Sequence, residues 1–223
     1  MSDIVIFGAG GRAGRAITAE ARERGHLVTA VVRDPDRHRD IQADGVRVVR
    51  GDVTDVAAIS SIVPGHDAAV QAVSPFSGPE QGFADLDPRF FVKAADALLH
   101  GLTEARVPRL VLVGLFANLL DVHGRPVMDD PSVFPVEIRP FAIAHTAGLD
   151  RLREAGDTEV DWLMLTPPAL LESTGPRTGR YRIGGETVPR SASARLSYAD
   201  LAVAVIDEID TPRHHRTRVS VFD

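Results

Sequence analysis

A glycine-rich turn near the N-terminus carries the clearest chemical signal in the sequence. Gly8, Gly11 and Gly14 recur at every third position, directly after the apolar segment 4–7. Glycines at this spacing allow a tight turn, a close approach of the backbone to a pyrophosphate, and close packing of a strand on the following helix. The alternative is a helix-entry turn that binds nothing, but the flanking strand and helix patterns favour the phosphate turn. The predicted contacts with the ligand are Gly8, Gly10, Gly11, Arg12, Ala13 and Gly14.

Arg33 ends the next apolar segment, 27–32, where a dinucleotide-binding domain contacts the adenosine ribose. An acidic residue there accepts from the ribose hydroxyl of NAD, whereas an arginine accommodates the 2′-phosphate of NADP. Arg12 in the glycine-rich turn adds a second guanidinium for that phosphate. The sequence therefore favours NADP(H) over NAD(H) as cofactor. The alternative is that Arg33 is a solvated charge and Asp34 binds the ribose.

Two later turns contain further candidate cofactor contacts. Asp52 and Val53 follow the third apolar segment, where Asp52 could accept from the adenine amino group while Val53 packs on the ring. Equally, Asp52 and Thr54 could cap the N-terminus of the next helix. Ser74 follows the fourth segment and would lie near the cofactor ribose. The proline after it favours an extended backbone at Ser74.

Strand-like and helical segments alternate along the chain, and this order determines where those turns lie. The β-branched apolar segments are 4–7, 27–32, 46–49, 68–73, 110–113, 162–165 and 219–222, and helical spacing covers 11–24 and 89–106. Near-continuous apolar strands are typical of a parallel sheet that is buried on both faces. We therefore predict an α/β fold, with a doubly wound, mostly parallel sheet of the Rossmann type in a single domain over residues 1–223.

Residue types at the segment ends predict the helix boundaries. Asp87 followed by Pro88 is typical of an N-cap and a first-turn proline. Ser197 with Asp200 resembles a capping box that opens a helix to about Asp207. Gly25 stands where a glycine commonly ends a helix.

Three long segments rich in proline and glycine follow apolar strands, at 75–88, 121–140 and 167–189. Ligands of open α/β sheets bind outside the carboxyl ends of the strands, so these loops should gather on the ligand side. We expect substrate-side loops at about 115–140 and 167–190. We interpret 174–189 as a mobile flap or a small subdomain rather than a plain surface excursion.

Composition excludes several classes of protein. The formal charge of −6, from 25 basic and 31 acidic side chains, argues against a nucleic-acid partner. The absence of cysteine excludes disulfides, thiolate metal sites and cysteine nucleophiles. We predict no metal site, because neither Asp129–Asp130 nor His214–His215 has partners at ligating spacing. A Gly-x-Ser-x-Gly hydrolase turn is also absent.

The apolar runs are about strand length, which predicts a protein without membrane-spanning segments. The N-terminal residues lack the basic and long apolar parts of a secretory signal, so we expect a cytoplasmic location. The sequence leaves open whether the protein is a monomer or a homodimer.

Taken together, five motifs in chain order resemble the atypical short-chain dehydrogenase/reductases with an NAD(P)H-binding domain. This group contains biliverdin reductase B/flavin reductase-like and NmrA-like proteins, and the resemblance covers essentially the whole chain. The motifs are Gly8–Gly14, Val32–Pro35, Gly51–Asp55, Thr166–Pro168 and Ser197–Ala202. The resemblance implies that Pro167 and Pro168 flank the nicotinamide and that segments from Val113 onward form the substrate side. It also makes Phe116 and Asn118 candidate substrate contacts.

The catalytic acid of that group is missing from this chain. Short-chain dehydrogenases usually carry Tyr-x-x-x-Lys, in which the lysine lowers the phenol pKa. Here four residues after Tyr181 and Tyr198 stand Gly185 and Ala202. The catalytic residues are therefore unknown from the sequence. His145 is a weak candidate proton donor, and we favour the interpretation that it is a core or helix-surface histidine.

Hydride transfer without that acid favours an acceptor that takes hydride with little help from the protein. Flavins and quinones are such acceptors, and the protein then orients and shields them. We predict an NADP-dependent reductase of a small conjugated substrate such as a flavin or quinone. The alternative is an NmrA-like sensor that binds NADP(H) without catalysis.

Overall fold

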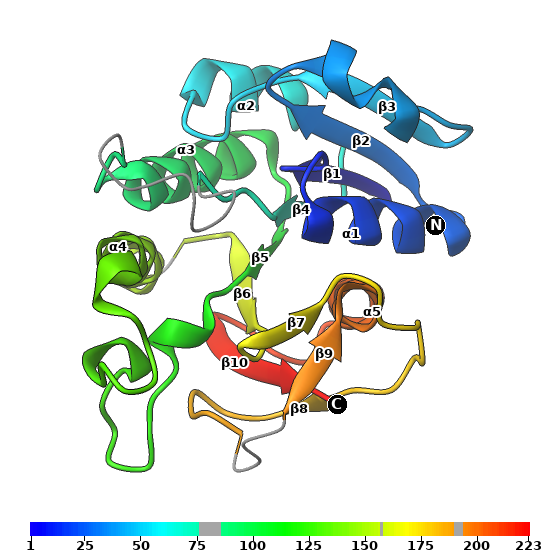
Figure 1. Cartoon of the computed structure of the whole chain (residues 1–223). Coiled ribbons are helices and arrows are strands. Elements are labelled where there is room, and N and C mark those ends of the chain that lie inside the picture. The colour runs from blue at the N-terminus through cyan, green and yellow to red at the C-terminus, as the bar shows by residue number, and fades with distance from the viewer. Residues whose placement is uncertain (76–85, 157, 190–193) are drawn as a thin grey trace.

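A computed structural model describes residues 1–75, 86–156, 158–189 and 194–223, so most of the predicted loop 75–88 lies outside the described residues. The chain forms an eight-stranded sheet with the strand order β3-β2-β1-β4-β5-β6-β10-β8. All neighbouring strands are parallel except β8, which pairs antiparallel with β10 at one edge. The predicted doubly wound α/β fold is confirmed (Figure 1).

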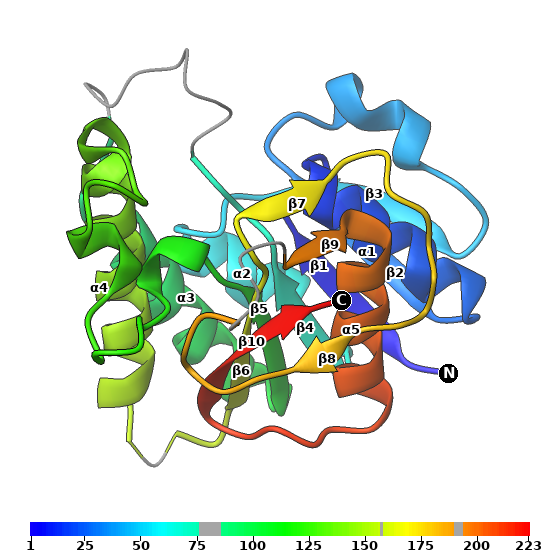
Figure 2. The same ribbon diagram turned by 60° about the horizontal axis from the view of Figure 1, so that its bottom comes forward.

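The strands begin and end close to the predicted apolar segments. The strands of the large sheet are β1 (Asp3–Phe7), β2 (Leu27–Val32), β3 (Val46–Arg50), β4 (Ala68–Gln71), β5 (Arg109–Val113), β6 (Asp161–Thr166), β8 (Arg182–Ile183) and β10 (Thr217–Phe222). A second, parallel two-stranded sheet contains β7 (Leu170–Glu172) and β9 (Arg195–Ser197). Figure 2 shows this small sheet next to the start of α5. Strands β7, β8 and β9 were not predicted, because two or three residues are too short to show a hydrophobic period.

Five α-helices in the described part of the chain cover the two faces of the large sheet. They are α1 (Arg12–Glu23), α2 (Val56–Ile62), α3 (Phe90–Ala105), α4 (Arg139–Glu154) and α5 (Tyr198–Asp210). Helices α1 and α5 bury one core against the sheet, with Ile17 and Leu201 fully buried. Helices α2, α3 and α4 bury the other, with Ile59, Leu98 and Leu149 fully buried. Each sheet face is therefore apolar, as a sheet between two helical layers requires.

The helix ends agree with the sequence at two of three predicted positions. Ser197 accepts from the Asp200 N–H as the N-cap of α5, and Gly25 has φ +82° just after α1. The prediction for Asp87–Pro88 is wrong in position, because α3 begins at Phe90 with Arg89 as N-cap. Asp87 instead accepts from the Arg89 N–H in the preceding turn and pairs with Lys93. Among the described residues, no helix is long and apolar enough to span a membrane.

Candidate functional site

The glycine-rich turn lies where the order of the large sheet reverses, between β1 and its neighbours β2 and β4. Gly8 and Ala9 donate backbone hydrogen bonds to the Val31 carbonyl near the end of β2. Gly8 has φ +84°, and a Cβ there would come within 2.7 Å of the Ala72 backbone after β4. Gly8 therefore satisfies two demands that only glycine meets, a left-handed backbone and a close strand contact.

The N-terminus of α1 is free to bind an anion. Gly11 is the N-cap, so no side chain caps the helix, and the first turn contains no acidic residue. A Cβ on Gly11 would meet only the Gly8 carbonyl oxygen, at 3.4 Å. The first backbone N–H groups of α1 thus have no side-chain acceptor among the described residues. The positive end of the helix dipole, which lies here, favours a phosphate.

Arg12 and Ala13 are the first two residues of α1, and their side chains have different surroundings. Arg12 is exposed, and its guanidinium carbon lies 5.6 Å from the centre of the Tyr198 ring on α5. The guanidinium also donates a long, 3.5 Å hydrogen bond to Ser173 after β7. Ala13 packs against the core shared by α1 and α5. Arg12 can therefore reach a ligand at the turn while resting on a tyrosine face.

The turn after β2 separates Arg33 from Asp34. Arg33 is exposed and has no hydrogen bond or ion pair among the described residues. Asp34 is the N-cap of the 3₁₀ segment η1 (Pro35–Ile41), accepting from the Asp36 N–H, and it also pairs with Arg37. The carboxylate of Asp34 is thus engaged by its own turn, whereas the guanidinium of Arg33 is available.

The turn after β3 decides whether Asp52 and Thr54 cap the next helix. One carboxylate oxygen of Asp52 accepts from both the backbone N–H and the hydroxyl of Thr54. The N-cap of α2 is Asp55, which accepts from the Ala57 and Ala58 N–H groups. The capping alternative is therefore wrong for both residues, because the helix begins one residue later than Thr54 allows. The adenine contact of Asp52 stays a prediction.

Three other predicted cofactor contacts lie around the same edge of the sheet. Val53 is only 3% exposed and packs into the core beneath α2. Ser74 is exposed just after β4, and Pro167 is buried just after β6. All three follow parallel strands at their carboxyl ends, which is where the fold gathers ligand contacts.

The substrate-side candidates Asn118 and His145 lie in direct contact. The Asn118 amide nitrogen is 3.0 Å from His145 Nδ1, and both side chains are buried. Asn118 ends the 3₁₀ turn η3 (Phe116–Asn118), and its carbonyl accepts from the buried guanidinium of Arg218 on β10. The Oδ1 atom of Asn118 has no partner among the described residues. Phe116 packs in a small apolar cluster next to this contact.

His145 is a core histidine, as the sequence favoured. Its ring lies 4.5 Å from the Phe91 ring centre, and it lines a small cavity of about 10 Å³ between α3, α4 and the sheet. Burial lowers the pKa of His145 to about 4, and the charge of Arg218 adds to this effect. At neutral pH the imidazole is therefore uncharged, and it is a hydrogen-bonding group rather than a source of protons.

The two predicted substrate-side loops contact each other. The Leu120 N–H donates to the Glu186 carbonyl, and the Val188 N–H donates back to the Leu120 carbonyl. The 3₁₀ turns η4 (Val127–Asp129) and η5 (Val136–Ile138) lie in the first loop. Val127 and Val188 share one apolar cluster, so the loops at 115–140 and 167–190 form one wall. Residue 190 itself lies outside the described residues.

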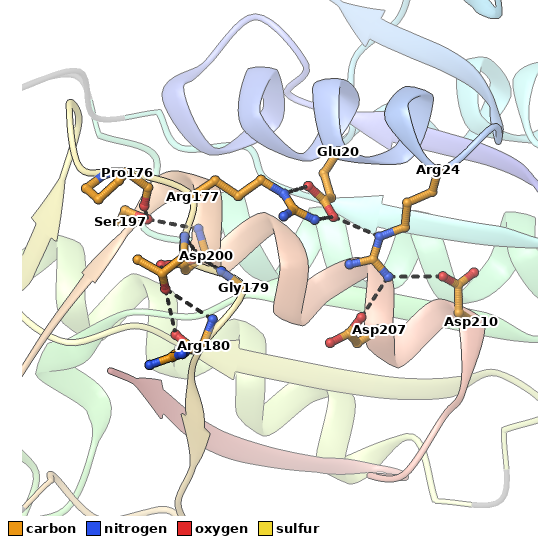
Figure 3. A network of polar contacts seen from close by, with 11 residues as sticks. Glu20, Arg24, Pro176, Arg177, Gly179, Arg180, Ser197, Asp200, Asp207 and Asp210 are labelled. Atoms are coloured by element: carbon orange, nitrogen blue, oxygen red, sulfur yellow. Dashed lines mark hydrogen bonds and ion pairs between the residues drawn. The ribbon is translucent and has the colours of Figure 1, made fainter.

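The segment interpreted as a mobile flap is anchored at its start. Arg177 donates two hydrogen bonds to Glu20 of α1, at 2.7 and 2.8 Å. The carboxylate of Asp200 accepts from the backbone N–H groups of Thr178 and Gly179, and Ser197 donates to the Pro176 carbonyl. Figure 3 shows these contacts joining the segment to α1 and α5. The part from 176 to 179 is therefore a strap across two helices.

Tyr181, one of two tyrosines in the chain, is bound to α5 through its hydroxyl. Its hydroxyl donates a 2.6 Å hydrogen bond to Asp207 on α5. Burial, together with this carboxylate, raises the pKa of Tyr181 above its usual value. Proton release from Tyr181 is thus harder than from a free phenol.

Sequence reasoning missed the side chains that support the site from other elements. These side chains contact residues that are 100 or more positions away in the sequence, and no local pattern in one sequence reveals such contacts. They are Glu20, Arg177 and Arg218. His38, in η1, lies against Gly10, and only the nearness of η1 to the turn brings them together.

Comparison with known proteins gives the wider context. A family model described as NAD(P)H-binding matches residues 8–212. The Bacillus subtilis protein YwnB is 35% identical over 222 residues, which cover 98% of this chain and 97% of YwnB. A "putative exported protein" of Burkholderia pseudomallei is 32% identical, with a TM-score of 0.83 and full coverage of both chains. SP1627 of Streptococcus pneumoniae, a "putative NADH-flavin reductase", is 26% identical, with a TM-score of 0.82 and full coverage of both chains.

Proposed function

The chain belongs to the NAD(P)H-binding family, in the group of atypical short-chain dehydrogenase/reductases, and from that premise we propose that it is an NADP-dependent oxidoreductase. Its substrate is a small conjugated hydride acceptor such as a flavin or a quinone. The observation that carries the proposal is the uncapped N-terminus of α1 beside a glycine-rich turn. The residues fit a dinucleotide, because no side chain caps α1 at Gly11 while Gly8 and Gly14 bring strand and helix together.

The preference for NADP rests on the turn after β2. The exposed guanidinium of Arg33 is available for a 2′-phosphate, and the occupied carboxylate of Asp34 makes a ribose contact by that residue less favourable. The reductase-like relative from Streptococcus is named for NADH, so the preference needs its own test.

Replacement of Arg33 by alanine tests this preference. We expect the variant to lose about tenfold or more in affinity for NADPH and to keep its affinity for NADH. Arg39→Ala is the matched control, since Arg39 is an exposed arginine of the neighbouring η1 whose one ion pair among the described residues is with Asp36. Equal losses of affinity for both cofactors would contradict a contact between Arg33 and the 2′-phosphate.

Within this proposal the chain binds, orients and shields, while the hydride comes from the nicotinamide of NADPH. Asn118 and Phe116, on the turn after β5, and Pro167, after β6, border the acceptor. His145 fixes the orientation of the Asn118 amide. His145 is neutral and the Tyr181 hydroxyl is bound to Asp207. The site therefore favours a hydride acceptor that needs no strong proton donor from the protein.

The decisive experiment is NADPH oxidation by the purified protein, followed optically against flavins, quinones and conjugated carbonyls, with NADH as a second donor. Oxidation with a flavin or quinone and a preference for NADPH is the expected result. Tight NADPH binding without oxidation by any acceptor would contradict the reductase and favour an NmrA-like sensor.

The proposal includes a cytoplasmic location and a small-molecule substrate rather than a nucleic acid. The name of the Burkholderia relative points to export, so fractionation of the source cells is the direct test. Recovery of the protein from a fraction other than the cytoplasm would contradict this part of the proposal.

A further inference from the structure

The ring of His38 lies directly on the glycine-rich turn. A Cβ added to Gly10 would come within 2.6 Å of both Cε1 and Nε2 of His38. Only a glycine at position 10 lets the imidazole come this close. The ring is partly exposed, so it forms a border of the turn and not part of the core.

Arg15 of α1 fixes His38 in this position. Its Nε donates to the Gly10 carbonyl at 3.0 Å, one Nη lies 3.2 Å from His38 Nδ1, and the guanidinium pairs with Asp40. A guanidinium has donors only, so Nδ1 of His38 must accept. The neutral ring then carries its proton on Nε2.

The Nε2–H group of His38 is consequently available at the turn as a hydrogen-bond donor. No hydrogen-bond partner of this atom occurs among the described residues. The charged groups that face the ring are Arg15 from α1 and Asp40 from the same 3₁₀ segment. These two neutralise each other, so the ring is held in place without a net charge from its neighbours.

His38 and Arg33 both lie next to the glycine-rich turn, His38 on Gly10 and Arg33 after the end of β2. Gly8 and Ala9 donate to Val31, two residues before Arg33, and His38 rests on the adjoining Gly10. We propose that His38 is a further determinant of cofactor specificity, whose neutral Nε2–H donates to the adenosine 2′-phosphate opposite Arg33. This inference rests on the proposed function, since it assumes that the 2′-phosphate binds at Arg33.

Calorimetric binding of two nucleotide fragments tests the inference without any turnover. Adenosine 2′,5′-bisphosphate carries the 2′-phosphate and adenosine 5′-monophosphate lacks it, so the ratio of their affinities isolates that group. His38→Phe keeps a ring on Gly10 and removes the donor. We expect His38→Phe to lose about tenfold in affinity for the bisphosphate and to bind the monophosphate within about twofold of wild type.

His38→Gln is the matched variant, because its side-chain amide offers an N–H donor at a similar reach. It should retain bisphosphate affinity within about threefold, and the difference between the wild type and His38→Phe should persist at about pH 8, because the proposed donor belongs to the neutral ring. Equal losses for both nucleotides in His38→Phe, or a glutamine variant as weak as phenylalanine, would overturn the role of the donor.

The same titrations separate this inference from the proposed function. If the wild type binds the bisphosphate no better than the monophosphate, the NADP preference itself fails. If the wild type prefers the bisphosphate and loses that preference in Arg33→Ala but not in His38→Phe, only the inference about His38 fails. Thermal melting of each variant shows that it is folded before binding is compared.

Discussion

Gly14 on α1 lies so close to the end of β1 that a Cβ there would come within 2.1 Å of the Gly8 carbonyl oxygen. This contact sets the spacing between the strand and the helix whose N-terminus faces the proposed pyrophosphate. Gly14→Ala should therefore push α1 away from β1. We expect a loss of about 1–3 kcal/mol in unfolding free energy and a loss of NADPH binding, measured by denaturant titration and calorimetry.

Gly11→Ala is the matched control for this prediction. Its added methyl would meet only the Gly8 carbonyl oxygen, at 3.4 Å, so the loss of stability should be about 1 kcal/mol or less, the usual cost of alanine in place of glycine at an N-cap. The methyl would nevertheless lie where the backbone approaches the pyrophosphate, so cofactor affinity should fall. A Gly11→Ala variant that binds NADPH as tightly as wild type would contradict the placement of the phosphate on this turn.

The fold was predictable because its signals are local. Each strand of the parallel sheet is a short β-branched run such as Leu27–Val32, and the glycine spacing before Arg12 identifies the first strand-helix connection. The predicted strand boundaries lie within about two residues of the observed ones, whereas the helix predicted to end at about Asp207 continues to Asp210.

The surroundings of the site were less predictable, because they depend on contacts between distant parts of the chain. The contact of Asn118 with His145 joins two residues that the sequence named separately. The hydrogen bonds that hold the strap join Arg177 to Glu20, 157 residues apart in the sequence, whereas the glycines in 174–189 suggested mobility. Such pairings follow from strand order and helix packing, which a single sequence does not specify residue by residue.

Glu20 holds the strap to α1 and should contribute to stability. Its side chain is 3% exposed and accepts from both Arg177 and Arg24. Glu20→Gln keeps the shape but loses the charge, so we expect a loss of about 2 kcal/mol in unfolding free energy at neutral pH. Asp36→Asn, which breaks the exposed pair with Arg39, should leave the denaturation midpoint unchanged.

The acid limb of the stability curve provides a second test of Glu20. The hydrogen bond from Arg177 is the main cause that lowers the pKa of Glu20. A carboxyl with a lowered folded-state pKa stabilises the fold above its unfolded value, and this stability is lost as the pH falls through the folded pKa. The wild type should therefore lose more stability below about pH 4.5 than Glu20→Gln. Parallel curves for the two proteins would contradict the role of this charge.

Asp55 and Asp52 lie three residues apart and should separate stability from binding. Asp55 caps α2 through two backbone N–H groups, so Asp55→Ala should cost about 1 kcal/mol in unfolding free energy and leave NADPH affinity unchanged. Asp52→Ala should weaken NADPH and NADH alike, since adenine is common to both. Calorimetry with the two cofactors checks this pair. If Asp52→Ala binds both as the wild type does, the predicted adenine contact is absent.

Burial of His145 predicts a loss of stability in mildly acidic solution. Its folded-state pKa is about 4, against about 6.5 for a free imidazole. Below pH 6.5 the unfolded chain takes up a proton at this position and the folded chain does not, so stability decreases as the pH falls towards 4. The expected loss between pH 7 and pH 5 is about 2 kcal/mol from this residue, measured by urea denaturation at both pH values.

Substitution of His145 isolates that contribution from those of other histidines. His145→Gln keeps a polar partner for Asn118 but does not titrate, so its unfolding free energy should fall less between pH 7 and pH 5 than that of the wild type. His100→Gln is the control, because His100 is 64% exposed on α3 and meets solvent in both states. An unchanged pH dependence in His145→Gln would mean that the buried imidazole gains a proton in the folded protein. In that case His145 would become a proton donor for the acceptor after all.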